Sequence, residues 1–357
     1  MKRLSLVMIV KNEERCLERC LKSVEGIVDE IIIVDTGSSD QTKQIALSYG
    51  ANIYDLKWEN DFAKARNYAL EQSKGDWNII LDADEYITHF DKEKIGDFMN
   101  KNNQLGNVKI INELSRDNIR NYSKVFVPRL LPKEVRYTRS IHEQPDTVFP
   151  SVVVPIEIYH DGYIDEQAKV KRNLIYLQEQ IKTSSQDGYL LYQLAYTLLL
   201  DKQYESADKY FQEFYRASPA KSKYRCAGII SYIENSMYLK KFHEGHKLIE
   251  KEEFNLQDSS EFYFVCAAFY REYVLDDVKS NIQYLPYVEQ CYLECLNIGE
   301  NDKYDGAIGT GSYLAAYNLG VWYEVNKLYD KATICYDMAI EWGYEKAIER
   351  KKALPKT

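Results

Sequence analysis

Two aspartates separated by one alanine, Asp82-Ala83-Asp84, are the residues of this chain that point most directly to chemistry. They close a strand expected over residues 77–82 (WNIILD), and side chains at i and i+2 of an extended segment face the same way. Two such carboxylates suit a hard divalent cation, Mg²⁺ or Mn²⁺, which completes its coordination with phosphate oxygens. The alternative is a strand end that carries solubilising acids.

Polar residues also follow the first two expected strands, over 4–10 and 30–35. Open α/β sheets bind ligands at the carboxyl ends of their strands, so a nucleoside is expected here. Asp35 is suited to accept a hydrogen bond from the N3–H of uracil. The expected nucleotide-binding positions at these two strand ends are Val10, Asn12, Glu13, Asp35 and Ser38.

Four further side chains are candidates for the reaction. Arg66 lies on an expected helix, where it either pairs with a diphosphate or is an ordinary surface arginine. Glu143, next to His142, is a candidate general base that deprotonates an acceptor, with a surface acid as the alternative. His160 ends an apolar strand and is either a third cation ligand or a hydrogen-bonded core histidine.

Strands and helices alternate up to about residue 82, which predicts a parallel α/β sheet. Three more strands without long helices between them should extend this sheet with mixed pairing. The helix expected over 40–49 has Ser39 as its candidate cap. The expected strands are 4–10, 30–35, 52–57, 77–82, 108–114, 125–132 and 151–159, and the early helices are 14–24, 40–49 and 62–73.

From about residue 168 the pattern is helical and rich in tyrosine, with two matches to the tetratricopeptide spacing. Small residues in these matches let two antiparallel helices touch, and an aromatic ring fills the space between them. The first match is Leu191, Leu194, Ala195, Leu198, Ala207, Phe211 and Pro219, and the second is Leu319, Gly320, Tyr323, Ala332, Tyr336 and Ala339.

The motifs of the first half resemble the family 2 glycosyltransferases of GT-A fold. The segments IVKNEE, IIIVDTGSSDQT, NDFAKARN and DWNIILDADEY follow that family's order. The later IHEQP and YHDGY segments are similar to those of bacterial members with a carboxy-terminal tetratricopeptide region, and among these to sublancin-type peptide S-glycosyltransferases. The expected domains are therefore a GT-A domain over 1–167, with a mixed, mainly parallel sheet, and an all-helical tetratricopeptide-like domain over 168–357.

The resemblance implies an inverting transferase with a UDP-sugar donor, UDP-glucose being the first choice, and Mg²⁺ or Mn²⁺. It places Asp84 and His160 on the cation, Asp82 near the ribose or the cation, and Ala83 between them. It places Asp35 near uracil and Arg66 on the nucleotide. Many relatives have a Glu-Asp pair at the base, where this chain has His142-Glu143.

Three functions remain open on this reading. The first is transfer of a sugar to a Cys, Ser or Thr side chain of a bacteriocin precursor peptide, with the helical domain binding the acceptor or forming a homodimer. The second is transfer to a cell-envelope glycan or a lipid-linked acceptor. The third is a non-catalytic tetratricopeptide scaffold.

The net charge of −9 argues against a nucleic-acid partner, which a basic face would attract. The 7 cysteines have no disulfide or zinc spacing, and we expect reduced thiols. No apolar run is long enough for an integral membrane segment. These features predict a cytoplasmic protein.

Overall fold

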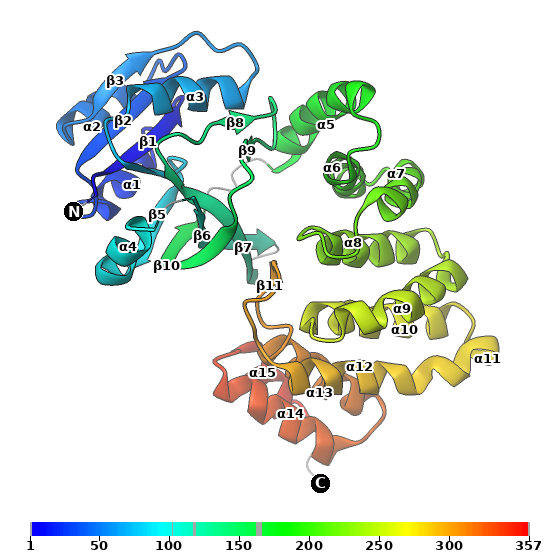
Figure 1. The fold of residues 1–357 in the computed structure, drawn as a ribbon. Helices are drawn as coiled ribbons and strands as arrows, with labels where there is room; N and C mark the ends of the chain where they lie inside the picture. Colours follow the sequence, from blue (N-terminus) through cyan, green and yellow to red (C-terminus); the bar gives the residue numbers. More distant parts are fainter. Residues whose placement is uncertain (1, 102, 117–118, 162–165, 356–357) are drawn as a thin grey trace. The chain divides into compact units, whose positions relative to one another are not determined.

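The computed structural model describes residues 2–101, 103–116, 119–161 and 166–355 (Figure 1). The chain divides into two compact units, Met1–Ile164 and Asp165–Thr357. The domain boundary expected at 167/168 lies three residues after this division. Gly162 and Tyr163, the last two residues of the YHDGY segment, lie outside the described residues.

The first unit is built on a mixed, mainly parallel sheet with the strand order β3-β2-β1-β4-β7-β6-β10-β5. Strands β3, β2, β1 and β4 are parallel, β7 pairs antiparallel with both β4 and β6, and β10 is parallel to β6 and antiparallel to β5. This confirms the fold class expected from the sequence. The strands are β1 Leu4–Val10, β2 Glu30–Asp35, β3 Asn52–Asp55, β4 Trp77–Ile80, β5 Glu85–Phe90, β6 Leu105–Arg116, β7 Ile119–Pro132 and β10 Ser151–His160, and β8 Tyr137–Thr138 and β9 Gln144–Pro145 form a separate small sheet.

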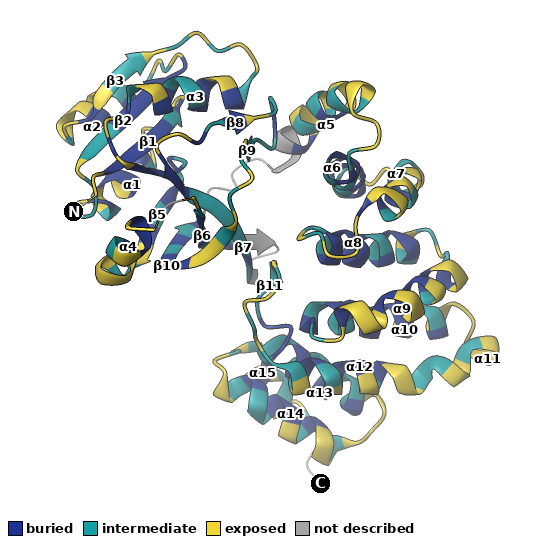
Figure 2. Cartoon of the chain, viewed as in Figure 1, coloured by how far each residue is buried: buried dark blue, intermediate teal, exposed yellow. Residues whose placement is uncertain are grey.

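Helices cover both faces of this sheet, which explains why β1 is apolar on both faces apart from the buried Ser5. Leu6 and Met8 join the core beneath α1, α2 and α4, whereas Val7, between them, joins the core beneath α3. Figure 2 shows the strands largely buried and the helices exposed along their outer faces. The helices are α1 Leu17–Ser23, α2 Thr42–Ser48, α3 Phe62–Gln72 and α4 Lys92–Met99.

Two local expectations about this unit are wrong. The fourth strand ends at Ile80, not at Asp82, because the carboxylate of Glu85 accepts a hydrogen bond from the Asp82 N–H at 2.8 Å and closes a turn there. Ser39 does not cap the second helix, which begins at Thr42; instead Asp40 accepts the Thr42 N–H at 3.0 Å. Strand β5 and helix α4 were not expected from the sequence.

The second unit consists of paired helices, as the tetratricopeptide-like spacing predicts. The expected contact residues Ala195, Ala207 and Phe211 are fully buried. Three pairs share a three-residue turn whose central lysine has a left-handed backbone, with φ values between 54° and 61° at Lys202, Lys240 and Lys327. The elements are α5 Glu166–Thr183, α6 Gly188–Leu200, α7 Tyr204–Ala217, α8 Arg225–Tyr238, α9 Phe242–Leu256, α10 Ser260–Asp276, α11 Val278–Asn281, η1 Ile282–Tyr284, α12 Leu285–Ile298, β11 Gly306–Ala307, α13 Tyr313–Val325, α14 Tyr329–Glu341 and α15 Lys346–Lys352.

Close helix contacts in this unit depend on glycine. A side chain at Gly228 of α8 would meet the ring of Phe214 at 2.3 Å, and one at Gly320 of α13 would meet Tyr336 at 2.6 Å. Each glycine therefore lets an aromatic ring lie directly on the backbone of its partner helix.

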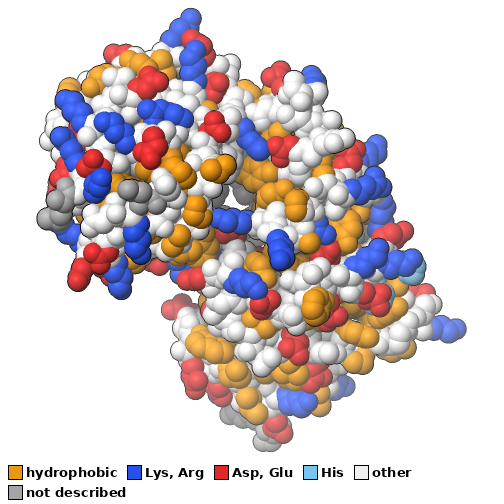
Figure 3. All heavy atoms as spheres, viewed as in Figure 1, with side chains coloured by type: hydrophobic (Ala, Val, Ile, Leu, Met, Phe, Trp, Pro, Cys, Tyr) orange, Lys and Arg blue, Asp and Glu red, His pale blue; other side chains and the backbone are white. Residues whose placement is uncertain are grey.

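The surface charge and the hydropathy of the helices complete the description of the fold. On the face drawn in Figure 3, basic and acidic side chains are intermingled, with apolar groups between them. In the part of the chain that the structure describes, no helix is both long and apolar enough to cross a membrane.

Candidate active site

The residues that follow β1 and β2 are locked to each other by hydrogen bonds. Asn12 has a left-handed backbone with φ 57°, and its N–H donates to Ser38 Oγ at 2.9 Å. Its side-chain oxygen accepts the Ser39 N–H at 2.8 Å, and the Glu13 N–H donates to Thr42 Oγ1 at 2.7 Å. The sequence-predicted nucleotide positions Asn12, Glu13 and Ser38 therefore form one rigid edge.

Asp35 ends β2 with one carboxylate oxygen occupied and the other available. Its Oδ1 accepts the N–H groups of Gly37 and Ser38, both at 2.9 Å. Its Oδ2 is buried and has no hydrogen-bond partner among the described residues. A buried acceptor without a partner costs free energy, so this oxygen is suited to a ligand donor.

Asp82 is held by two arginines. Its Oδ1 accepts from Arg66 at 2.8 Å and its Oδ2 from Arg129 at 2.9 Å. Burial alone would raise the pKa of Asp82, but these two guanidinium groups hold it well below its usual range. Arg129 also donates to Glu85 at 3.0 Å. Both oxygens of Asp82 are thus used within the protein.

Arg66 joins this cluster to the loop that carries His142 and Glu143. Its Nε donates to Glu143 Oε1 at 2.5 Å, and its side chain is only 6% exposed. Burial would raise the pKa of Glu143, but the ion pair with Arg66 lowers it overall. Glu143 is therefore an ionised partner of Arg66 with reduced proton affinity.

Helix α3 positions this loop. Asn67 exchanges two hydrogen bonds with the backbone of Tyr137, at 2.8 and 2.7 Å, and the Phe62 N–H donates to the Ser140 carbonyl at 2.9 Å. His142 follows with a left-handed backbone, φ 50°. The chain between β8 and β9 is thereby fixed against the helix that presents Arg66.

Asp84 contacts His160, whereas Asp82 contacts the two arginines. The distance from Asp84 Oδ2 to His160 Nε2 is 3.1 Å, and His160 Nδ1 lies 2.9 Å from Asn112 Oδ1. Asn112 Oδ1 and Asp84 Oδ2 thus contact the two ring nitrogens of His160 from opposite sides of the imidazole. The strand on which the expectation of a shared direction rested ends at Ile80, before both aspartates, and the two carboxylates bind different partners. Ala83 between them is buried.

The Asp84–His160 pair fits a divalent cation. Two adjacent ligands of an octahedral ion at about 2.1 Å lie about 3 Å apart, close to the separation of Oδ2 and Nε2. Asn112 fixes the imidazole as a second-sphere partner does in metal sites. The described residues contain no group of three or more His, Cys, Asp or Glu side chains that could hold a metal, so Asp84 and His160 stand as a candidate pair of ligands and not as part of a larger cluster.

A second ion pair fixes the end of β10, which carries His160. Arg19 on α1 binds both oxygens of Asp161, at 2.7 and 2.6 Å, and its guanidinium lies 4.3 Å from the centre of the Tyr86 ring. Bidentate pairs of this kind define orientation as well as distance. The imidazole is therefore held from the side of Asn112 and from the following residue.

The sequence model of the glycosyl transferase family 2 matches residues 5–150. This range contains the strand ends described above, except the end of β10, which carries His160. The first unit is a family 2 glycosyltransferase domain. The chain is 28% identical to a TPR repeat-containing protein of Synechococcus elongatus, over 60% of this chain and 56% of that protein. It is 27% identical to the SPbeta prophage-derived glycosyltransferase SunS of Bacillus subtilis, over 56% of this chain and 50% of that protein. The chain spans about half the length of the curated relatives it matches.

Among solved structures, part of the chain is similar to glucosyl-3-phosphoglycerate synthase of Mycobacterium tuberculosis in complex with Mg²⁺ and uridine diphosphate. The likeness covers 31% of this chain and 43% of that chain, with 20% identity and a TM-score of 0.25.

Sequence reasoning missed three side chains that position the site of the transferase domain: Arg129, Asn112 and Glu85. Arg129 stands in an otherwise apolar part of β7, and a buried arginine there requires an anionic partner. Asn112 lies directly opposite His160 in the β6–β10 register. That pairing was not readable from the sequence, because β6 and β10 are separated by β7 in the chain.

Proposed function

We propose that the chain is an inverting, cation-dependent glycosyltransferase that moves a sugar from a UDP-sugar to a peptide side chain. The observation that carries the proposal is the Asp84–His160 pair, in which Asp84 Oδ2 lies 3.1 Å from His160 Nε2 while Asn112 holds the other ring nitrogen. Asp84 and His160 would hold a divalent cation, which would supply positive charge to a bound diphosphate.

The nucleoside is assigned to the carboxyl ends of β1 and β2. The unpartnered Oδ2 of Asp35 is suited to accept the N3–H of uracil, and Lys43 lies 3.8 Å from its other oxygen. The carbonyl of Val10 already accepts the Thr36 N–H at 2.9 Å, so Val10 contributes a wall and not a hydrogen bond. Asn12, Glu13 and Ser38 supply the rigid edge beside it.

The diphosphate is assigned to the region of Asp84, His160 and Arg66. A bound cation would neutralise the charge that develops on the leaving UDP. Arg66 keeps one buried nitrogen, Nη1, without a hydrogen-bond partner among the described residues, and this donor is available to a phosphate oxygen. Asp82 serves this site indirectly, because it fixes Arg66 and Arg129 in place.

Glu143 is assigned to orienting Arg66 and not to removing the acceptor proton. Its ion pair lowers its pKa, which weakens it as a base. A cysteine acceptor fits this arrangement, since a thiol with an ordinary pKa of about 8.5 requires less assistance than a hydroxyl. UDP-glucose remains the donor to test first, with Mg²⁺ and Mn²⁺ as the cations.

The test is a donor and acceptor screen by mass spectrometry. The full chain is incubated with UDP- or GDP-sugars, with Mn²⁺, Mg²⁺ or EDTA, and with a cysteine peptide or its serine counterpart. We expect cation-dependent consumption of a UDP-sugar and a hexose mass on the peptide.

The matched variants are Asp35→Asn, which should weaken UDP binding, and Asp97→Asn on the exposed face of α4, which should not. Turnover undiminished in EDTA would overturn the cation assignment. Consumption of donor with no peptide product, but with transfer to a glycan acceptor, would overturn the peptide assignment.

A further inference from the structure

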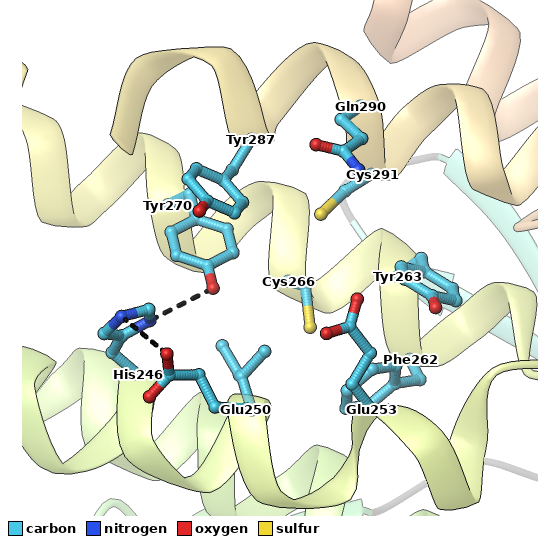
Figure 4. A pocket seen from close by; sticks show the side chains of 11 residues that line it. His246, Glu250, Glu253, Phe262, Tyr263, Cys266, Tyr270, Tyr287, Gln290 and Cys291 are labelled. Carbon is cyan, nitrogen blue, oxygen red and sulfur yellow. Dashed lines mark hydrogen bonds and ion pairs between the residues drawn. The ribbon is translucent and has the colours of Figure 1, made fainter. Parts of the chain in front are cut away.

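A pocket of about 120 Å³ opens in the helical unit between α9, α10 and α12 (Figure 4). This volume is well below the roughly 300–1,000 Å³ of sites for whole small molecules, so it suits a single side-chain-sized group. Neither the transferase chemistry nor the tetratricopeptide-like packing requires a cavity at this position.

The walls of the pocket are aromatic. The rings of Tyr270 and Tyr287 lie 4.9 Å apart, and His246 donates to or accepts from the Tyr270 hydroxyl at 3.2 Å. Phe262 and Tyr263 form the opposite wall. Aromatic faces carry partial negative charge and attract cations.

The polar atoms that face the pocket are mainly hydrogen-bond acceptors. In Figure 4 the carboxylate of Glu253 points toward the cavity and that of Glu250, which also lines it, points to His246; Glu253 has no ion-pair or hydrogen-bond partner among the described residues. Glu250 has His246 at 3.7 Å. None of the residues that line the pocket is lysine or arginine.

Two buried thiols complete the pocket. Cys266 is 1% exposed and Cys291 6%, and in Figure 4 both sulfurs point into the cavity. Neither has a hydrogen-bond partner among the described residues. Burial raises the pKa of Cys266 and takes that of Cys291 to about 12, so both are neutral, weak acceptors. The negative charge of the pocket therefore comes from the two glutamates.

We propose that this pocket binds a guanidinium or primary ammonium group. Such a group matches the pocket in size and can donate hydrogen bonds to the carboxylates, sulfurs and hydroxyl oxygens. A planar guanidinium or a compact ammonium group can also pack against the tyrosine rings. Its source is either a small organic amine or a basic side chain of a peptide. The proposal does not depend on the transferase reaction.

The experiment is a ligand-observed NMR titration of the full chain, without nucleotide or cation, with n-butylguanidinium, n-butylammonium and the neutral n-butylurea. The site variant is Glu250→Gln/Glu253→Gln. The matched control is Glu205→Gln/Glu244→Gln, which changes the charge equally at two exposed positions outside the pocket. We expect a charged probe to bind, the site variant to weaken it at least tenfold, and the control to leave it unchanged.

A second arm distinguishes the two sources. An arginine-containing peptide is compared with the same peptide carrying citrulline. Preferential binding of the arginine peptide supports a side-chain ligand, and binding of the free cations alone supports a small-amine ligand.

Tyr287→Ala, at a position 42% exposed, tests the aromatic wall without removing a buried side chain. The proposal is overturned if n-butylurea binds as well as the cations, or if the site variant binds them as tightly as the unchanged protein.

Discussion

The two units are held together by different kinds of side-chain contact. In the transferase domain, charged side chains converge where strands end: Arg66 and Arg129 share Asp82, and Asp84 faces His160. In the helical unit, aromatic rings pack against one another, and glycines leave room for these rings between the helices. The first arrangement fixes atoms that a ligand can use, whereas the second fixes the helices themselves. Changes in the first should therefore affect turnover, and changes in the second should affect stability.

The largest effect is expected at Asp84. Asp84→Asn keeps the size of the side chain but removes the charge that faces His160, so donor turnover should fall by about 10²–10³-fold. The thermal midpoint should stay within about 2 °C, because the side chain is one-third exposed and asparagine keeps its size. Initial rates and calorimetry measure both, with Asp97→Asn as the control. Retained turnover would remove the cation assignment.

The helical unit offers the opposite case at Gly228. Gly228→Ala places a methyl group 2.3 Å from the Phe214 ring, and such overpacking should lower the free energy of unfolding by about 1–3 kcal/mol. Cation-dependent donor hydrolysis at 15 °C should be unchanged. Gly96→Ala on α4, where the added methyl group meets no atom within 4 Å, should instead be neutral or stabilising. Equal destabilisation of both variants would contradict the packing explanation.

Glu234 on α8 provides a pH-dependent test within the helical unit. Burial raises its pKa to about 7, so the folded protein holds a proton that the unfolded chain loses above its ordinary pKa near 4.5. Stability should therefore fall as the pH rises from about 4.5 to 7. Glu234→Gln removes this penalty and should stabilise the protein by about 1–2 kcal/mol at pH 8 and not at pH 4.

Urea unfolding at the two pH values measures the Glu234 effect, with the exposed Glu244→Gln as its control. A constant difference at both pH values would show that the ionisation of Glu234 is not its cause.

The smallest effect is expected at Glu143. If it orients Arg66, Glu143→Gln keeps one acceptor oxygen for the guanidinium and should lower kcat/KM about fivefold, with the shape of the pH profile unchanged. A general base would behave differently, because its loss removes the acidic limb of the profile. The profile of kcat/KM from pH 5 to 9 decides between the two roles.

The sequence predicted the strands of the first unit better than the geometry of its site. Continuous apolar runs such as 4–10 mark strands covered on both faces, and helix pairing in the second unit followed from small residues such as Ala195. The turn after Ile80 was not predicted, because it depends on the carboxylate of Glu85 three residues later. Arg129 and Asn112 were missed because their partners come from distant strands.

The Arg19–Asp161 ion pair has a mechanical consequence. Asp161 is the residue that follows His160, and the chain then continues toward the second unit. Because Asp161 directly follows His160, its ion pair with Arg19 ties the end of β10 to α1 and limits rotation of the backbone that carries the imidazole. The pair thus acts as an anchor, which restricts the orientations that His160 can take relative to Asp84.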